Sequence, residues 1–121
     1  MVQVLLIDDD ESHNLILKQV LESNGHTVII ADNGHDGFQK IAETPDLDVV
    51  IADERMPVMT GTELKAKVLK EIPNPPVFYI LTGHRSDENW QQGVLYKPVD
   101  KGDLLDIIEL SGDLSPDNPP K

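Results

Sequence analysis

The chain has 121 residues, a length that suits one compact domain with a buried core of its own. Because it contains no cysteine, disulfide bonds, thiolate metal sites and a cysteine nucleophile are excluded. Its 22 acidic and 10 basic side chains give a formal net charge of −12, which repels nucleic-acid phosphates and anionic lipid. We therefore expect no direct nucleic-acid binding and no membrane association. For most of the acidic side chains, we expect no role beyond solubility.

The N-terminal sequence, MVQVLLIDDD, has no basic segment and becomes acidic at once, which is not typical of a signal peptide. The apolar runs elsewhere are far too short to span a bilayer. Together with the lack of cysteine, these features predict a cytoplasmic protein.

Apolar and amphipathic segments alternate through the first half of the chain. The run VQVLLI is nearly continuous and apolar, as in a buried strand of a parallel sheet. After it, Leu15, Ile16 and Val20 recur at helical spacing, and Gly25 suits the end of that helix. In chain order, the sequence predicts a strand over residues 2–7, a helix over 12–23, a strand over 27–31, a turn at Asn33-Gly34, a helix over 36–43 and a strand over 48–52.

The second half of the chain begins with a helix that the breaker run PNPP closes. Beyond the strand VFYIL the signal weakens, and only about two helical turns fit before the next strand. The predicted elements are, in order, a helix over 62–71, a strand over 77–81, a short helix over 86–92, a strand over 94–96 and a helix over 102–110. Residues 111–121 carry three prolines and no periodicity, so we expect a disordered tail or linker after a single domain of residues 1–110.

Alternating strands and helices predict an α/β fold, in which helices cover both faces of a parallel sheet. Ligands of such folds bind at the carboxyl ends of the strands. The polar residues that follow the predicted strands are Asp8, Asp9 and Asp10 after the first, Asp53 after the third, Thr82 after the fourth and Lys97 after the fifth. The sequence therefore predicts one pocket that combines carboxylates, a hydroxyl and an ammonium group.

Each of these signals is weak when taken alone. An acidic triplet after a strand commonly caps the next helix, and a single aspartate there is usually a turn former. Carboxylates that lie side by side need a cation to stay ionised, and Mg²⁺ prefers such oxygen ligands. A hydroxyl and a lysine would bind an anion next to them. The combination predicts phosphoryl transfer to an aspartate nucleophile.

Four motifs resemble those of the receiver domains of two-component signalling systems. They are LLIDDD at residues 5–10, VVIADERMPVMTG at 49–61, ILTG at 80–83 and YKP at 96–98. The second is highly specific, because it combines Asp53 with Met56-Pro57 and Gly61. The resemblance covers residues 2–110 and implies a three-layer α/β/α sandwich with the flavodoxin-like strand order 2-1-3-4-5.

The resemblance also implies roles for individual residues. Asp53 would be the phosphoacceptor. The ligands of Mg²⁺ would be Asp8, Asp9, Asp53 and the backbone carbonyl of Arg55, with Asp8 acting through metal-bound water. Thr82 would bind the phosphoryl oxygens, and Lys97 would pair with the carboxylate and then with the phosphoryl group.

For the protein as a whole, the resemblance implies a switch rather than a metabolic enzyme. A histidine kinase or a phosphotransfer protein would supply the phosphoryl group, and an effector domain or a partner protein would respond. The receiver would catalyse only its own phosphorylation and dephosphorylation. Any homodimer would be weak.

Two features depart from the family pattern. Thr82 and Lys97 are only fifteen positions apart, about two helical turns fewer than usual, which predicts a shortened fourth helix. Val94 stands three residues before Lys97, where the family has an aromatic switch residue. Tyr96 is near, but neighbouring side chains along a strand point to opposite faces, so it is not an obvious substitute. The chemistry of the site is kept, whereas we expect a weak relay from Thr82 to the output face.

Two other functions fit parts of the pattern. A receiver fold kept only as a dimerisation or docking module would explain Val94 and the shortened helix, but it leaves the complete acidic set without a purpose. A phosphatase of the haloacid dehalogenase type needs a second aspartate two residues after the nucleophile, where this chain has Arg55.

The remaining polar candidates carry less information. Asp10 matches no family role and is expected to cap the first helix. Trp90 is expected to pack over the shortened helix. The histidines have no metal-like spacing and are expected at the surface or in packing, with one of them close to the phosphoryl group: His13, His26, His35 and, near that group, His84.

Overall fold

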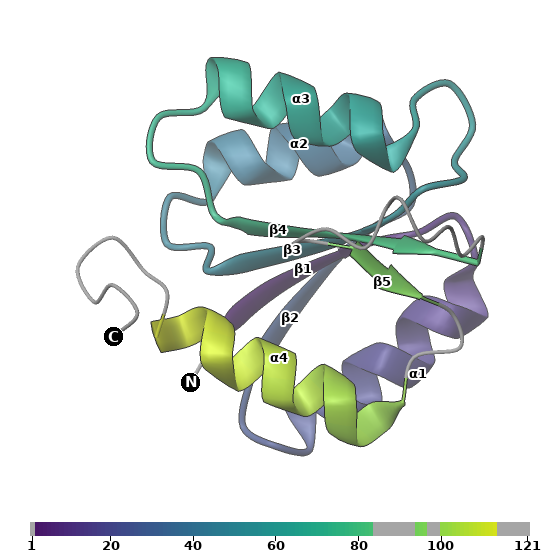
Figure 1. Ribbon diagram of the computed structural model, residues 1–121, viewed down its shortest axis with the longest axis vertical. Coiled ribbons are helices and arrows are strands. Elements are labelled where there is room, and N and C mark those ends of the chain that lie inside the picture. The colour runs from purple at the N-terminus through teal and green to yellow at the C-terminus, as the bar shows by residue number, and fades with distance from the viewer. Residues whose placement is uncertain (1, 84–93, 97–99, 114–121) are drawn as a thin grey trace.

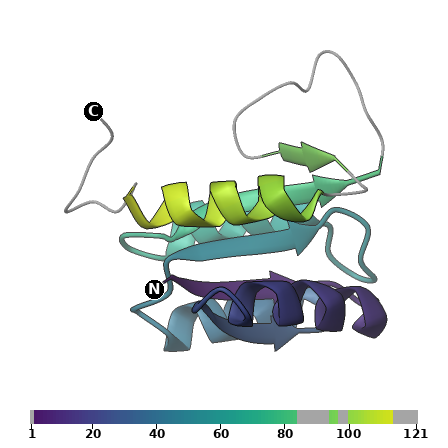
Figure 2. The same cartoon turned by 90° about the horizontal axis from the view of Figure 1, so that it is seen from below.

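The computed structural model describes residues 2–83, 94–96 and 100–113 and has the predicted α/β architecture. Its elements are, in chain order, β1 (Gln3–Ile7), α1 (Glu11–Glu22), β2 (Thr27–Ala31), α2 (Gly34–Glu43), β3 (Val49–Asp53), α3 (Gly61–Glu71), β4 (Val77–Thr82), β5 (Val94–Tyr96) and α4 (Lys101–Asp113). The sheet is parallel, and α2 and α3 cover one face while α1 and α4 cover the other (Figures 1 and 2). Its strand order, β2-β1-β3-β4-β5, confirms the predicted one.

Side chains of the central strand β1 alternate between two hydrophobic clusters, one on each face of the sheet. Leu5 belongs to the cluster that includes Leu64 of α3. Leu6 belongs to the opposite cluster, with Leu21 of α1 and Ile108 of α4. Each of these side chains is at most 1% exposed, and burial of such a side chain contributes about 1.5–3 kcal/mol. β1 is therefore buried on both faces, as its continuous apolar sequence predicts.

Short polar side chains begin the first three helices. Asp10 caps α1 by accepting a hydrogen bond from the His13 N–H at 3.2 Å, which confirms the predicted cap. Thr60 caps α3 in a capping box with Glu63. The turn predicted at Asn33-Gly34 is wrong, because Asn33 caps α2 and Gly34 is its first residue.

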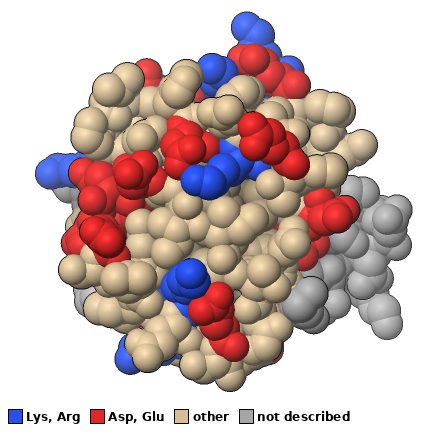
Figure 3. Space-filling view, turned by 180° about the vertical axis from the view of Figure 1, so that it is seen from behind, with Lys and Arg blue, Asp and Glu red and all other residues tan. Residues whose placement is uncertain are grey.

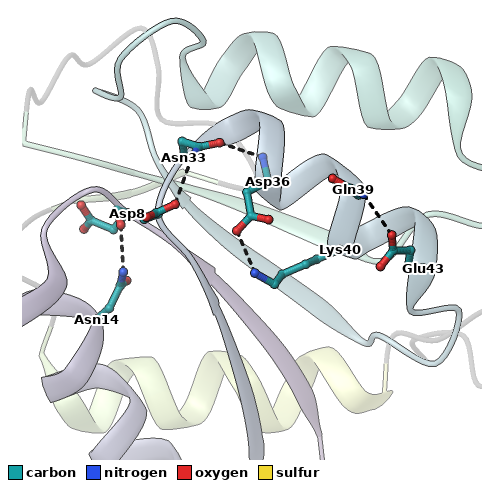
Figure 4. Close-up of polar contacts among 8 residues, drawn as sticks. Asp8, Asn14, Asn33, Asp36, Gln39, Lys40 and Glu43 are labelled. Carbon is teal, nitrogen blue, oxygen red and sulfur yellow. Dashed lines mark hydrogen bonds and ion pairs between the residues drawn. The ribbon is translucent and has the colours of Figure 1, made fainter.

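The start of α2 has a steric reason as well as a polar one. Asn33 accepts a hydrogen bond from the Asp36 N–H at 2.7 Å, and Asp36 pairs one turn later with Lys40 at 2.7 Å (Figure 4). A Cβ on Gly34 would lie 3.2 Å from the Met59 side chain, so the close approach of the β3–α3 loop favours glycine here.

The end of the last helix also differs from the prediction. Residues 111–113 were expected in a disordered tail, but α4 continues to Asp113. The sequence signal failed there because the prolines that mark the tail begin only later. The predicted short helix over 86–92, Trp90, His84, Lys97 and the tail beyond Asp113 lie outside the described residues.

Acidic side chains spread over the molecular surface in several clusters. Figure 3 shows this distribution on the face opposite that of Figure 1, where basic side chains stand between the carboxylates and form no broad patch of their own. Among the described residues, no helix has the length and apolar character needed to cross a bilayer.

Candidate functional site

The site lies at the carboxyl edge of the sheet, where β1, β3 and β4 end side by side. Asp8 directly follows β1, whose last residue, Ile7, pairs in register with Ala52 of β3. Asp53 is the next residue of β3 and pairs with Leu81, so Thr82 at the end of β4 stands one step further along. The register alone thus brings residues from distant parts of the chain to one edge, as predicted.

Three carboxylates converge at this edge and form the acid cluster of Asp8, Asp9 and Asp53. Their nearest oxygens all lie within 4.8 Å of one another. Asp8 and Asp53 are only 4% and 6% exposed, whereas Asp9 is exposed. Two like charges at that separation repel by roughly 3 kcal/mol at an effective dielectric constant of about 20, so three ionised carboxylates here need a cation. Oxygen donors alone fit a hard divalent ion such as Mg²⁺.

Asp8 is fixed in place by its neighbours at the start of α1. Its backbone N–H donates to the carbonyl of Ala31 at 3.1 Å, and its carbonyl accepts from the side-chain amide of buried Asn14 at 2.8 Å (Figure 4). Its carboxylate accepts from the Asp10 N–H at 2.9 Å and contacts His13 Nδ1 at 2.7 Å. The acid cluster is therefore partly preorganised by hydrogen bonds on its β1 side.

The loop between β3 and α3 is held just as firmly on the other side. Glu54 donates its N–H to the carbonyl of Leu81 at 2.9 Å and accepts from the Gly61 N–H at 3.1 Å. Its carboxylate accepts from the N–H of Thr62 at 2.7 Å and from the hydroxyl of that residue at 2.9 Å. Glu54 thereby joins the end of β3 to the first turn of α3, where a negative charge also complements the helix dipole.

A strained turn interrupts this loop at Val58. Its φ is 74°, and the Met59 N–H donates across it to the carbonyl of Pro57 at 2.8 Å. Such a γ-turn with positive φ is rare, and for a β-branched residue the left-handed region is unusually costly. The Val58 side chain is fully exposed, so burial does not offset that cost.

The structure brings together the predicted Asp8, Asp9 and Asp53 and places Thr82 half-buried at the end of the neighbouring strand. Arg55 is exposed two residues beyond Asp53, and Lys97 lies outside the described residues. The sequence reasoning missed the parts played by His13 and Glu54. His13 is the third residue of α1, and a signal existed, because side chains of a helix point back toward its N-terminus.

Comparison with known proteins assigns the fold to one family. The family model described as response regulator receiver domain matches residues 4–109. The chain belongs to this family. The predicted resemblance is therefore confirmed. Receiver domains are signalling modules that bind Mg²⁺ at an acidic pocket and interact with histidine kinases, phosphotransfer proteins and effector domains.

Relatives of this receiver domain include long and short proteins. Transcriptional regulatory protein GlrR of Escherichia coli K12 is 39% identical over 113 residues, which is 88% of this chain but 25% of GlrR. The chain thus spans about a quarter of the length of that relative. Protein PilH of Pseudomonas aeruginosa is 34% identical, and the match covers 89% of this chain and 95% of PilH.

Solved receiver structures share the whole fold. The CheY-like response regulator receiver domain protein of Methanospirillum hungatei JF-1 is 32% identical, with a TM-score of 0.81 over 93% of this chain and 94% of that one. A receiver domain protein of Clostridium thermocellum is 31% identical, with a TM-score of 0.80 over 92% of this chain and 94% of that one.

Proposed function

We propose that this receiver domain is a phosphorylation switch in which Asp53 accepts a phosphoryl group from the phosphohistidine of a histidine kinase or phosphotransfer protein. The single observation that carries the proposal is the position of Asp53. It is 6% exposed and lies within 4.8 Å of two other carboxylates at the carboxyl edge of the sheet. Burial of an ionised aspartate next to two other carboxylates destabilises the fold unless the site also holds a cation.

The same acid cluster supplies most of the ligands that would hold Mg²⁺. Asp9 and Asp53, with the backbone carbonyl of Arg55, would hold Mg²⁺, and Asp8 would act through water. When bound, Mg²⁺ would neutralise the negative charge that gathers on the phosphoryl oxygens. Its presence would also remove the repulsion that the three carboxylates otherwise impose on the fold.

The protein groups would carry the transfer itself. A carboxylate oxygen of Asp53 attacks phosphorus in line, the P–N bond to the donor histidine breaks, and the imidazole leaves with the electron pair of that bond. The Thr82 hydroxyl donates a hydrogen bond to a phosphoryl oxygen, and the Lys97 ammonium pairs with the same group. Water later hydrolyses the acyl phosphate and restores Asp53.

Incubation with acetyl phosphate or phosphoramidate in Mg²⁺, followed by intact-mass measurement, tests the proposal. We expect the protein to gain the mass of one phosphoryl group. Asp53→Asn should gain none, whereas Asp103→Asn, which changes an exposed acid of α4, should react like the wild type. An unmodified wild-type protein, or equal phosphorylation of Asp53→Asn, would contradict the proposal.

A second function, docking without a switch, is favoured by one observation. Val94 is half-buried in β5 and pairs with Ile80, so the position that carries an aromatic in the family resemblance holds a short aliphatic side chain. In that case Asp53 would still be modified in the assay, but partner binding would not depend on the modification. An effector domain or separate partner protein would then bind the two forms equally well.

A further inference from the structure

We propose that His13 is a positioning residue of the acid cluster, which holds the Asp8 carboxylate in the orientation that supports Mg²⁺ binding. The inference deepens the proposed function and rests on it for the identity of the ion. A single contact supports this role of His13. Nδ1 of His13 lies 2.7 Å from Oδ2 of Asp8, and the Asp8 side chain is only 6% exposed.

The chemistry of the contact fixes which imidazole nitrogen bears hydrogen. A carboxylate only accepts hydrogen bonds, so Nδ1 of His13 must be the donor at 2.7 Å. The His13 side chain is 27% exposed, so solvent still reaches part of the ring. The contact is therefore a directed hydrogen bond to a carboxylate and belongs to the stronger class of such bonds.

The two oxygens of Asp8 are engaged from two directions. Oδ1 accepts from the N–H of Asp10 at 2.9 Å, which comes from the loop, and Oδ2 accepts from His13, which comes from the helix. Rotation of the carboxylate about its own bond would break both hydrogen bonds at once. Each oxygen keeps a second lone pair for metal-bound water. Asp8 is thus presented to the cluster in one orientation.

The backbone of His13 is itself well anchored. Its N–H donates to the Asp10 carboxylate at 3.2 Å, and the following residue, Asn14, donates to the carbonyl of Asp8 at 2.8 Å. Asp8, Asp10, His13 and Asn14 therefore form one closed network at the start of α1. A ring held by such a network loses little entropy in making its contact.

Hydrogen-bond partners of metal-binding side chains raise metal affinity, typically about 10–100-fold, by fixing their orientation. Without the His13 ring, the Asp8 carboxylate would keep one hydrogen bond instead of two and could turn away from Asp9 and Asp53. Its own repulsion from those carboxylates would favour that turn. We therefore expect His13 to matter more for Mg²⁺ binding than for the stability of the fold.

Isothermal titration of the full chain with Mg²⁺ tests the inference. His13→Leu should raise the dissociation constant by about tenfold or more. His13→Asn should stay within about threefold of the wild type, because its amide N–H can take the place of Nδ1–H. His35→Leu, which removes an exposed histidine of α2, should bind like the wild type. Urea unfolding without Mg²⁺ should show that all four proteins are folded, with His13→Leu the least stable because it leaves the buried Asp8 carboxylate with one hydrogen bond fewer.

The outcomes separate this inference from the proposed function. If folded His13→Leu binds Mg²⁺ as tightly as the wild type, or if His13→Asn is as weak as His13→Leu, the positioning role is wrong. If the wild type binds no Mg²⁺, the inference falls together with the metal assignment. A wild type that binds Mg²⁺ but gains no phosphoryl group would overturn the proposed function alone.

Discussion

The carbonyl oxygen of Asp53 lies directly against Gly61, so closely that a Cβ at Gly61 would come within 2.7 Å of it. Real Cβ atoms essentially never come this close to a backbone atom, and a backbone carbonyl cannot swing aside as the end of a side chain can. The first residue of α3 is therefore packed onto the last residue of β3. The geometry of the acid cluster depends on this contact, because Asp53 belongs to both.

Gly61→Ala should accordingly destabilise the protein by about 1–3 kcal/mol, although alanine is the better helix former by about 1 kcal/mol. It should also slow phosphorylation of Asp53, since the displaced carbonyl shifts the carboxylate. Urea unfolding and the intact-mass time course measure the two effects. Gly83→Ala is the control, because a Cβ there meets nothing within 4 Å among the described residues. Equal stability of the two variants would contradict the steric argument.

The strained turn at Val58 predicts an unusual ranking of small residues. At ordinary positions alanine is more stable than glycine, by about 0.4–1 kcal/mol. At Val58, with φ of 74°, Val58→Gly should instead be more stable than Val58→Ala by about 1 kcal/mol. Because the Val58 side chain is fully exposed, neither variant loses buried surface, so the difference reports the backbone. Thermal melts at a fixed Mg²⁺ concentration measure which variant is more stable, and a higher melting temperature for Val58→Ala would contradict the prediction.

Removal of the Glu54 carboxylate should weaken the start of α3. Glu54→Ala takes away the acceptor for the N–H and the hydroxyl of Thr62 and should cost about 1 kcal/mol in urea unfolding. Glu71→Ala makes the same substitution at the other end of α3, where an acid opposes the helix dipole, so it should be neutral or slightly stabilising. A cost of the same size at both ends would show that the hydrogen bonds from Thr62 to Glu54 are not the cause.

Mg²⁺ should stabilise the fold through the acid cluster. At ten times the dissociation constant, a ligand that binds only the folded state adds about 1.4 kcal/mol, which raises the melting temperature. Asp9→Ala should abolish most of this rise, and it should melt slightly higher than the wild type without Mg²⁺, because one repelling charge is gone. Asp103→Ala should keep the full rise. Equal Mg²⁺-induced shifts in wild type and Asp9→Ala would contradict the assignment.

The small side chain of Val94 predicts a restrained response to phosphorylation. Coupling requires contacts that differ between two states, and half-buried Val94 offers fewer such contacts than an aromatic would. With beryllofluoride, which mimics the phosphoryl group, amide NMR shifts should concentrate near Asp8, Asp9 and Asp53. Val94→Tyr should extend the shifts along the chain from 83 to 96. Large shifts through that region in the wild type, together with dimerisation, would show that a conventional switch operates.

The sequence predicted the strands well and the helix starts less well, for a physical reason. Gly34 and Gly61 were left outside their helices, because glycine is a poor helix former. Both are nevertheless the first residues of helices, and both are pressed against another segment, Met59 and the Asp53 carbonyl respectively. A single sequence does not reveal such close approaches, since they arise only when distant segments meet.

The candidate site likewise contains residues that the sequence predicted and residues that it did not. Aspartates that directly end strands were found, because the edge of a parallel sheet fixes where they must meet. His13 was passed over, since its partner Asp8 is reached across the cap of α1 rather than at a metal-like spacing. Glu54 was passed over because its role depends on the path of the loop back to Thr62.

The order of strands in the sheet also sets a gradient of local stability. β1 and β3 lie inside the sheet with paired strands on both sides, whereas within the described part of the chain β5 pairs only with β4, over Val94–Tyr96. We expect backbone amides of β1 and β3 to exchange with solvent mainly through global unfolding, and those of β5 through local opening. Asp53, the proposed acceptor of the phosphoryl group, thus belongs to the part of the domain that we expect to exchange most slowly. A conformational change that spreads from Asp53 toward β5 would reach an edge strand that we expect to open more readily. There, a small change in the free energy of opening has the largest effect on the population of open states.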